Sequence, residues 1–93
     1  APANNNAFWI EILGGGKMQS IRAYKNVSKS LEKGGYHHLC MDVNNVDATV
    51  SELRKRGVTI LGQTFYVAAI KRKIAFFQDP WGNIIELAEV ITK

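Results

Sequence analysis

The chain has 93 residues, of which 46% are hydrophobic and 22% charged, and its formal net charge is +4 at pH 7. This length suits one small domain with one hydrophobic core and excludes two. No apolar run approaches the roughly 20 residues that a membrane-spanning helix needs, and residues 1–6 lack the organisation of a secretory signal. We therefore expect a cytoplasmic protein without membrane attachment, with a disordered leader at residues 1–6 and one domain at residues 7–93.

The excess of basic over acidic residues raises the question of a polyanionic partner. The basic residues fall into three loose groups, at residues 22–33, 54–56 and 71–73, and the second group closes a predicted helix, where the helix dipole stabilises cations. No nucleic-acid recognition module is visible, so we expect no binding to nucleic acid. An anionic small molecule, such as a carboxylate, a phosphate or a thioester of coenzyme A, fits scattered positive charge better.

Cys40 is the single cysteine of the chain, which excludes an intrachain disulfide and fits a reducing compartment. It lies within an apolar strand pattern, where a buried thiol is the expected state. We therefore assign Cys40 no catalytic role.

Residues 7–13 form a β-prone, largely apolar run with Glu11 in its middle, and three glycines end it. This run predicts an N-terminal strand. Residues 27–33 predict a short amphipathic helix, because Val27 and Leu31 lie four positions apart while Ser30 and the other polar residues lie outside them.

Residues 36–43 alternate in a way that predicts a strand. Its residues 36, 38, 40 and 42 share one face, so Tyr36, His38, Cys40 and Asp42 lie together, with Asp42 as a charge at the strand end. The adjacent His37 and His38 are expected to point to opposite faces.

A helix follows this strand, with Asn44 or Asn45 as its N-terminal cap and with Val46, Val50 and Leu53 on one face. Gly57 supplies the left-handed residue that ends it.

The C-terminal part of the chain predicts three strands. Residues 58–61 and 64–70 are β-prone, with a bulge or bend between them, and residues 73–77 and 83–90 flank a turn rich in Asp, Pro, Gly and Asn. The order from residue 36 onward is therefore β-α-β-β-β.

Glu86 is an anomaly in the last strand, because it lies between Ile85 and Leu87 with Ile84 and Ala88 as neighbours on its own face. Two interpretations stay open. Glu86 lies at a strand edge and faces water or a lysine, as most charged residues do, or it is a metal ligand or a catalytic base.

Three segments together resemble one module of the vicinal oxygen chelate superfamily: residues 35–43 (GYHHLCMDV), 52–58 (ELRKRGV) and 73–87 (KIAFFQDPWGNIIEL). The superfamily includes glyoxalase I, methylmalonyl-CoA epimerase, extradiol dioxygenases, fosfomycin-resistance proteins and bleomycin-binding proteins, and the resemblance is closest to the glyoxalase and epimerase branch. It implies an α+β fold in which a β-α-β-β-β module forms a half-barrel, here with an extra N-terminal strand and a short helix. In such proteins two half-barrels enclose a divalent metal ion.

Carried over by position, the resemblance implies that His38 and Glu86 are metal ligands. The family's ligand histidine has four residues between it and a valine on its strand, which selects His38 with Val43 and leaves His37 outside the pair. Glu11 resembles the last-strand glutamate of a preceding module and is the candidate third ligand. Imidazole and carboxylate suit Zn, Ni, Co, Fe and Mn alike. Glu86 and Glu11 are also the candidate catalytic carboxylates.

The sequence departs from the two-module pattern ahead of Phe8, where a further histidine strand, helix and two strands would stand. Two alternatives stay open: the chain is a fragment of a two-module protein, or it is a short member that builds its site by pairing two copies. A half-barrel exposes its concave face and its edges, so we expect a homodimer, with residues 8–13 as the candidate for an exchanged strand.

The resemblance implies a first function, a metal-dependent isomerase, epimerase or lyase. The metal would stabilise an enediolate or enolate while a carboxylate shuttles the proton. The alternative is a non-catalytic binding or sequestering protein of the bleomycin-resistance type, which needs no metal. A truncated module without activity is the third hypothesis.

Overall fold

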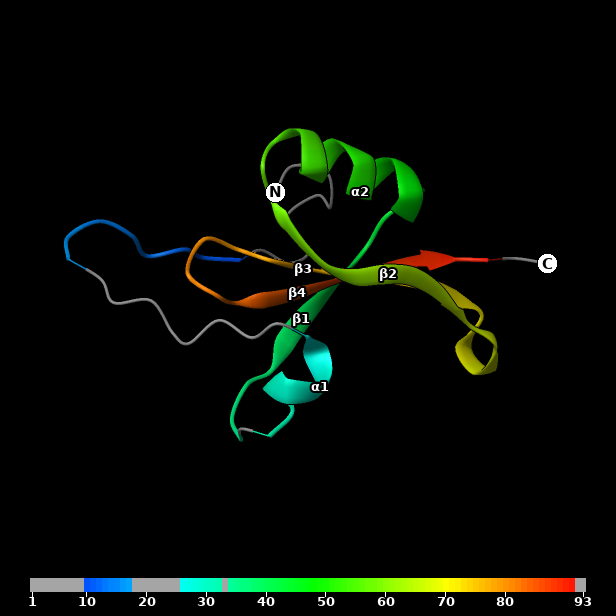
Figure 1. Ribbon diagram of the computed structural model, residues 1–93, viewed down its shortest axis with the longest axis horizontal. Helices are drawn as coiled ribbons and strands as arrows, with labels where there is room; N and C mark the ends of the chain where they lie inside the picture. Colours follow the sequence, from blue (N-terminus) through cyan, green and yellow to red (C-terminus); the bar gives the residue numbers. More distant parts are fainter. Residues whose placement is uncertain (1–9, 18–25, 33, 92–93) are drawn as a thin grey trace.

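The computed structural model describes residues 10–17, 26–32 and 34–91 of the chain (Figure 1). Its elements, in chain order, are α1 (Val27–Ser30), β1 (His38–Asp42), α2 (Val46–Lys55), β2 (Thr59–Val67), the 3₁₀ helix η2 (Ala68–Ile70), β3 (Arg72–Gln78) and β4 (Ile84–Val90). The predicted α+β class and β-α-β-β-β order are confirmed. The predicted leader and residues 7–9 of the predicted N-terminal strand lie outside the described residues, and the division into leader and domain stays a prediction.

The four strands form one sheet in the order β1-β4-β3-β2. β1 and β4 are parallel, whereas β3 is antiparallel to both of its neighbours. The crossover from β1 through α2 places this helix on one face of the sheet, where it contacts β2, β3 and β4 (Figure 1). This arrangement is the half-barrel that the sequence predicts, with the opposite face of the sheet free of α2.

The core lies between α2 and the sheet. Its buried residues are Val46 and Val50 of α2, Ala75 of β3 and Leu87 of β4, with Val43, Leu53, Ile60 and Phe77 packed against them. The predicted inner face of α2, at positions 46, 50 and 53, is therefore confirmed. Because side chains alternate along a strand, Phe76 and Glu86 point away from this core.

The start of α2 is held by two side chains. Asn45 is its N-cap, and the Asn45 Oδ1 accepts a hydrogen bond of 2.9 Å from the backbone N–H of Ala48. Glu89 of β4 accepts a second bond, of 2.8 Å, from the N–H of Val46. These bonds satisfy two of the backbone donors that the first turn of a helix leaves free. They also tie α2 to the end of the sheet.

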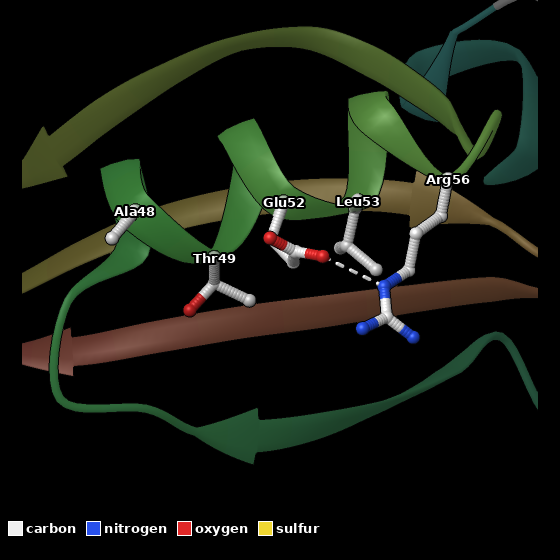
Figure 2. Close-up of a pocket in the computed structure, with 5 residues that line it drawn as sticks. All are labelled: Ala48, Thr49, Glu52, Leu53 and Arg56. Atoms are coloured by element: carbon white, nitrogen blue, oxygen red, sulfur yellow. Dashed lines mark hydrogen bonds and ion pairs between the residues drawn. The ribbon is translucent and has the colours of Figure 1, made fainter.

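One flank of α2 faces solvent over a shallow hollow (Figure 2). Figure 2 shows Thr49, Glu52, Leu53 and Arg56 projecting from this flank, with an ion pair between Glu52 and Arg56. The Glu52 Oε2 and Arg56 Nε atoms are 2.8 Å apart, and both side chains are largely exposed. A pair at this spacing supports a helix modestly.

The hairpin between β3 and β4 is confirmed, and Asp79 organises its turn. The Asp79 Oδ1 accepts hydrogen bonds from the backbone N–H groups of Trp81, at 3.0 Å, and Asn83, at 2.8 Å. Gly82 has a φ of +93°, which favours glycine at this position. Trp81 is 46% exposed at the tip of the turn.

The β-prone residues 58–61 and 64–70 form one strand, β2 (Thr59–Val67), and the expected bulge lies between Leu61 and Phe65, as predicted. β2 ends at Val67, before the predicted end at Ile70, because the next three residues form η2.

The predicted N-terminal strand is wrong for residues 10–13, which form no strand. Ile12 is 85% exposed and Leu13 is 81% exposed. β-prone residues form a strand only beside a partner, and in the described part of the chain no strand pairs with this segment.

The predicted orientation of the short helix is also wrong. α1 spans Val27–Ser30, and Ser30 is only 4% exposed whereas Leu31 is 64% exposed. In a helix of only one turn, tertiary packing decides which side chains are buried. Ser30 is buried because it faces the start of β1, where it makes a hydrogen bond with His37. None of the helices in the described ranges is long and apolar enough to cross a membrane.

Candidate metal and substrate site

His38 of β1 and Glu86 of β4 meet on the face of the sheet that α2 leaves uncovered. In the parallel register of these strands, Cys40 is opposite Glu86, and His38 lies two residues before Cys40 on the same face. The His38 Nε2 atom lies 2.7 Å from the Glu86 Oε1 atom. The His38 side chain is 28% exposed and that of Glu86 is 16% exposed. The predicted common face of these two residues is confirmed, and their role as metal ligands stays a prediction.

Two phenylalanine side chains lie beside this pair, on the same face of the sheet. Phe76 of β3 is opposite Glu86 in the sheet register, and its ring meets the His38 ring edge-on with a centroid distance of 5.4 Å. Phe65 of β2 stacks on Phe76 with a centroid distance of 6.3 Å and an interplanar angle of 27°. The polar pair therefore stands at the edge of an aromatic surface.

Cys40 is an exposed residue, so its predicted burial is wrong. Its position on β1 places it opposite Glu86. Partial desolvation of the thiol, and then the negative charge and hydrogen bonding of Glu86, raise the pKa of Cys40 to about 11. Arg72 of β3 acts in the other direction, which places a cation near the same face. The thiol stays protonated at neutral pH.

Glu11, the third predicted ligand, is not brought to this pair. It is exposed, and no hydrogen bond or ion pair joins it to another residue within the described ranges. Across residues 10–17, 26–32 and 34–91 no cluster of three His, Cys, Asp or Glu side chains is arranged to hold a metal ion. One copy of the described structure therefore brings together two of the three predicted ligands, His38 and Glu86.

His37 does not point to the opposite face from His38, as strand alternation predicts. The two rings make an edge-on contact with centroids 4.8 Å apart, and their Nδ1 atoms are 2.6 Å apart. Alternation does not apply to this pair because β1 begins at His38, so His37 precedes the strand. The His37 Nε2 atom lies 2.5 Å from the Ser30 Oγ atom. Sequence reasoning missed both His37 and Ser30 as residues next to the site.

A hollow of about 570 Å³ lies beside β1. Its lining includes Ile10 and Ile12, which flank Glu11 in the sequence, together with Leu39 and Met41 of β1. Leu39 and Met41 alternate with His38 and Cys40, so this part of the hollow lies on the other face of the strand. Glu86 is not among its lining residues. Tyr36, His37 and His38 line it as well, so the hollow extends from the N-terminal segment to the histidines of the site without including the Glu86 carboxylate.

Comparison with known proteins identifies the family of this chain. A family model described as the Glyoxalase/Bleomycin resistance protein/Dioxygenase superfamily matches residues 2–87. Human mitochondrial methylmalonyl-CoA epimerase is 31% identical over 58 residues, which cover 60% of this chain and 33% of the human protein. A glyoxalase family protein from Enterococcus faecalis superposes with a TM-score of 0.54 at 27% identity, over 59% of this chain and 43% of that chain.

A glyoxalase family protein from Bacillus cereus shares the fold, with a TM-score of 0.58 at 24% identity, over 67% of this chain and 41% of that chain. The chain spans about a third of the length of the epimerase and less than half of the two solved structures. The family model nevertheless covers most of the chain, and the resemblance found in the sequence is confirmed. The chain belongs to the glyoxalase/bleomycin resistance protein/dioxygenase superfamily.

Proposed function

We propose that the chain is part of a divalent-metal-dependent isomerase, epimerase or lyase of the glyoxalase and methylmalonyl-CoA epimerase type. The observation that carries the proposal is the contact between His38 and Glu86, two residues 48 positions apart that meet 2.7 Å from each other on the free face of the half-barrel. Superfamily membership supports it, because these proteins typically use divalent metals.

The donor set fits such an ion. Imidazole nitrogen and carboxylate oxygen bind Zn, Ni, Co, Mn and Fe. Two ligands of one ion at about 2.0–2.2 Å stand roughly 3 Å apart when their bonds are near a right angle, so His38 and Glu86 need to separate only slightly. Two protein ligands are too few for a stable site. The remaining ligands come from Glu11, from a second half-barrel or from the substrate.

The chemistry proposed is proton transfer next to a carbonyl group. A bound divalent ion would stabilise the negative charge of the enediolate or enolate oxygens. The Glu86 carboxylate, held beside the His38 ring, takes or returns the substrate proton, and Glu11 is the candidate for the opposite face if a second half-barrel brings it near. Phe76 and Phe65 exclude water from one side of the reacting carbon.

An anionic substrate is favoured by the charges on this face. Arg72 lies near enough to Cys40 to lower the pKa of the thiol, in opposition to Glu86. A cation on the same face as the proposed metal site would attract a carboxylate or the phosphates of a coenzyme A substrate. The similarity to methylmalonyl-CoA epimerase makes an acyl thioester of coenzyme A the first substrate to try.

A second copy of the chain is proposed to complete the site. Members of the superfamily bind small molecules and are often dimeric. The face that carries His38 and Glu86 is open, and Phe65 at its far side is 46% exposed. Light scattering at micromolar concentration tests the homodimer, which a clean monomer would contradict.

Metal analysis tests the enzyme. Protein purified without chelator and freed of any histidine tag should carry a stoichiometric divalent ion, or gain melting temperature when Ni, Co, Zn or Mn is added. In D₂O, the loaded protein should then exchange the proton at carbon 2 of methylmalonyl-CoA, followed by NMR. Protein that carries no ion and does not respond to added ions removes the basis of the enzyme proposal.

A second candidate function is binding without chemistry. The stacked rings of Phe65 and Phe76 favour it, because an exposed aromatic surface binds planar or cationic ligands. Calorimetric titration with bleomycin in the presence of EDTA tests this candidate. Phe65→Ala should weaken such binding, whereas Tyr66→Ala, also exposed but on the next residue of β2 and so on the other face, should not.

A further inference from the structure

The two edge strands of the sheet, β1 and β2, differ in how their edges are protected. β2 carries a bulge between Leu61 and Phe65, and a bulge twists an edge strand so that it pairs poorly with another chain. β1 has an unbroken register with β4, contains no proline or lysine, and is exposed at all five of its residues. In the described part of the chain, no strand pairs with the outer side of β1 (Figure 1). A regular edge strand without such protection is a template for a further strand.

The backbone groups that β1 turns outward follow from its pairing with β4. The N–H of Val43 donates to the carbonyl of Ala88 at 2.8 Å. Because successive residues of a strand direct their backbone groups to opposite sides, His38, Cys40 and Asp42 direct their N–H and C=O groups away from β4. These groups form a row of donors and acceptors along the outer side of β1.

The hollow of about 570 Å³ reaches this outer side. His38 lines it from one face of β1, whereas Leu39 and Met41 line it from the other face. A hollow that side chains from both faces of an edge strand share lies beside the edge itself. It leaves room for a further strand, which would run about 4.8 Å from β1.

The sequence of β1 is complementary to itself in the antiparallel direction. A pair centred on Cys40 matches all five residues, whereas a pair centred on a neighbouring residue matches fewer. In the register centred on Cys40, Leu39 lies opposite Met41 of the second copy, so two apolar side chains that are 39% and 38% exposed cover each other. The two Asp42 carboxylates stand at opposite ends of the pair. The outward backbone groups also fall into hydrogen-bonded pairs.

We propose that two copies of the chain associate through the outer edges of their β1 strands, antiparallel and centred on Cys40. The two four-stranded sheets then form one continuous sheet, and the His38–Glu86 contacts of both copies lie on the same face of it. This inference rests on the homodimer of the proposed function and names the surface that forms it. It does not depend on a bound metal ion.

Cys40 gives the first test, because it is the single cysteine of the chain. Opposite residues in a hydrogen-bonded antiparallel pair have Cα atoms about 5.5 Å apart. A short bis-maleimide, which forms one thioether with each thiol, should therefore join two full chains at Cys40. The double variant Cys40→Ala, Ser51→Cys moves the thiol to the exposed face of α2 and should give no covalent dimer. A wild type that dimerises in light scattering without cross-linking at Cys40 would overturn the inference and leave the homodimer standing.

Two variants with opposite charges test the register. Leu39→Lys and Met41→Glu each place a charge opposite an apolar side chain of the second copy, and each contact occurs twice in a two-fold dimer. The Kd of either homodimer should rise on the order of tenfold. In an equimolar mixture Lys and Glu face each other at one contact and Leu and Met at the other, so a heterodimer should form, followed by native mass spectrometry. Dimerisation that is equally weak in the mixture would contradict the proposed register.

A second mixture is the matched control. Leu39→Lys and Leu39→Glu are opposite each other only in a register centred on Leu39, so this mixture should recover less affinity than the first. Greater recovery here would overturn the register centred on Cys40.

Ile12→Asp separates the proposed edge from an exchanged N-terminal strand. Ile12 is 85% exposed in one copy, and the variant should dimerise as the wild type does. Loss of the dimer in Ile12→Asp would assign the edge of β1 to that segment and overturn the inference. A wild type that is monomeric removes both the homodimer and this inference, whereas a dimer cross-linked at Cys40 that binds no divalent ion supports the inference and removes the metal function.

Discussion

The His38 Nε2 and Glu86 Oε1 atoms are 2.7 Å apart although Glu86 is in register with Cys40 and not with His38. The contact runs diagonally across two parallel strands, so it depends on both side chains reaching along the same face. A diagonal contact of this kind brings a histidine at the start of one strand and a glutamate in the middle of the next to one point. That point is where a divalent ion is proposed to bind.

Removal of either donor should abolish metal binding with little loss of stability. His38→Ala and Glu86→Gln each leave one protein donor, which cannot hold the ion, while the partly exposed pair contributes about 1 kcal/mol or less to folding. A saturating ion at a hundred times its Kd stabilises the wild type by about 2.7 kcal/mol. Thermal melts with and without Zn²⁺ measure both effects.

Asp42→Asn is the matched control for these variants. Asp42 is a carboxylate at the end of the same strand, and among the described residues no hydrogen bond or ion pair joins it to His38 or Glu86. Its melting temperature should respond to Zn²⁺ as the wild type does. A normal response in His38→Ala would place the ion elsewhere.

The N-terminal cap of α2 gives a prediction about stability alone. Asn45→Ala removes the side-chain bond to the N–H of Ala48 and should lower the free energy of unfolding by about 1 kcal/mol. Asn44→Ala, one residue earlier and exposed, removes no cap and should change it by less than about 0.5 kcal/mol. Urea denaturation distinguishes them, and equal effects would mean that the cap contributes nothing.

A substitution in the hydrophobic core should lower the free energy of unfolding more than the loss of the α2 cap does. Leu87 is 1% exposed and lies between α2 and the sheet, so Leu87→Ala should lower the free energy of unfolding by about 2–5 kcal/mol. Val90→Ala, in the same strand but half exposed, is the control and should cost well under this. A loss below about 1 kcal/mol for Leu87→Ala would mean that the core around it collapses without leaving a cavity.

The β-α-β-β-β order and the common face of His38 and Glu86 could be predicted, because both follow from local patterns. Alternation fixes which residues share a face of a strand, and the resemblance supplied the pairing of the first and last strands. The cap at Asn45, the bulge in β2 and the turn at Asp79 were similarly local.

The contacts of Ser30 and His37 beside His38 could not be predicted, since they depend on where β1 begins and on how α1 packs. β1 begins at His38, two residues after the predicted start, which frees His37 from alternation, and the sequence does not mark that boundary. The N-terminal strand failed for a related reason: Ile12 and Leu13 have strand propensity, but a strand also needs a neighbour to pair with.

Cys40 offers a chemical test of the electrostatics around Glu86. Desolvation and the Glu86 carboxylate raise the pKa of its thiol from 9.0 to about 11, so the thiolate fraction at pH 8 falls about a hundredfold. The greater nucleophilicity of a more basic thiolate offsets part of this, and iodoacetamide should label Cys40 on the order of tenfold more slowly than an ordinary cysteine. The labelling rate should rise with pH until the thiol is fully ionised above pH 11.

The Glu86→Gln variant tests the cause of this shift. It removes the negative charge beside Cys40, which lowers the pKa of the thiol and should speed labelling at pH 8. The control Glu52→Gln, on the exposed flank of α2, should leave the rate unchanged. A rate in Glu86→Gln equal to the wild type would show that the carboxylate does not act on the thiol.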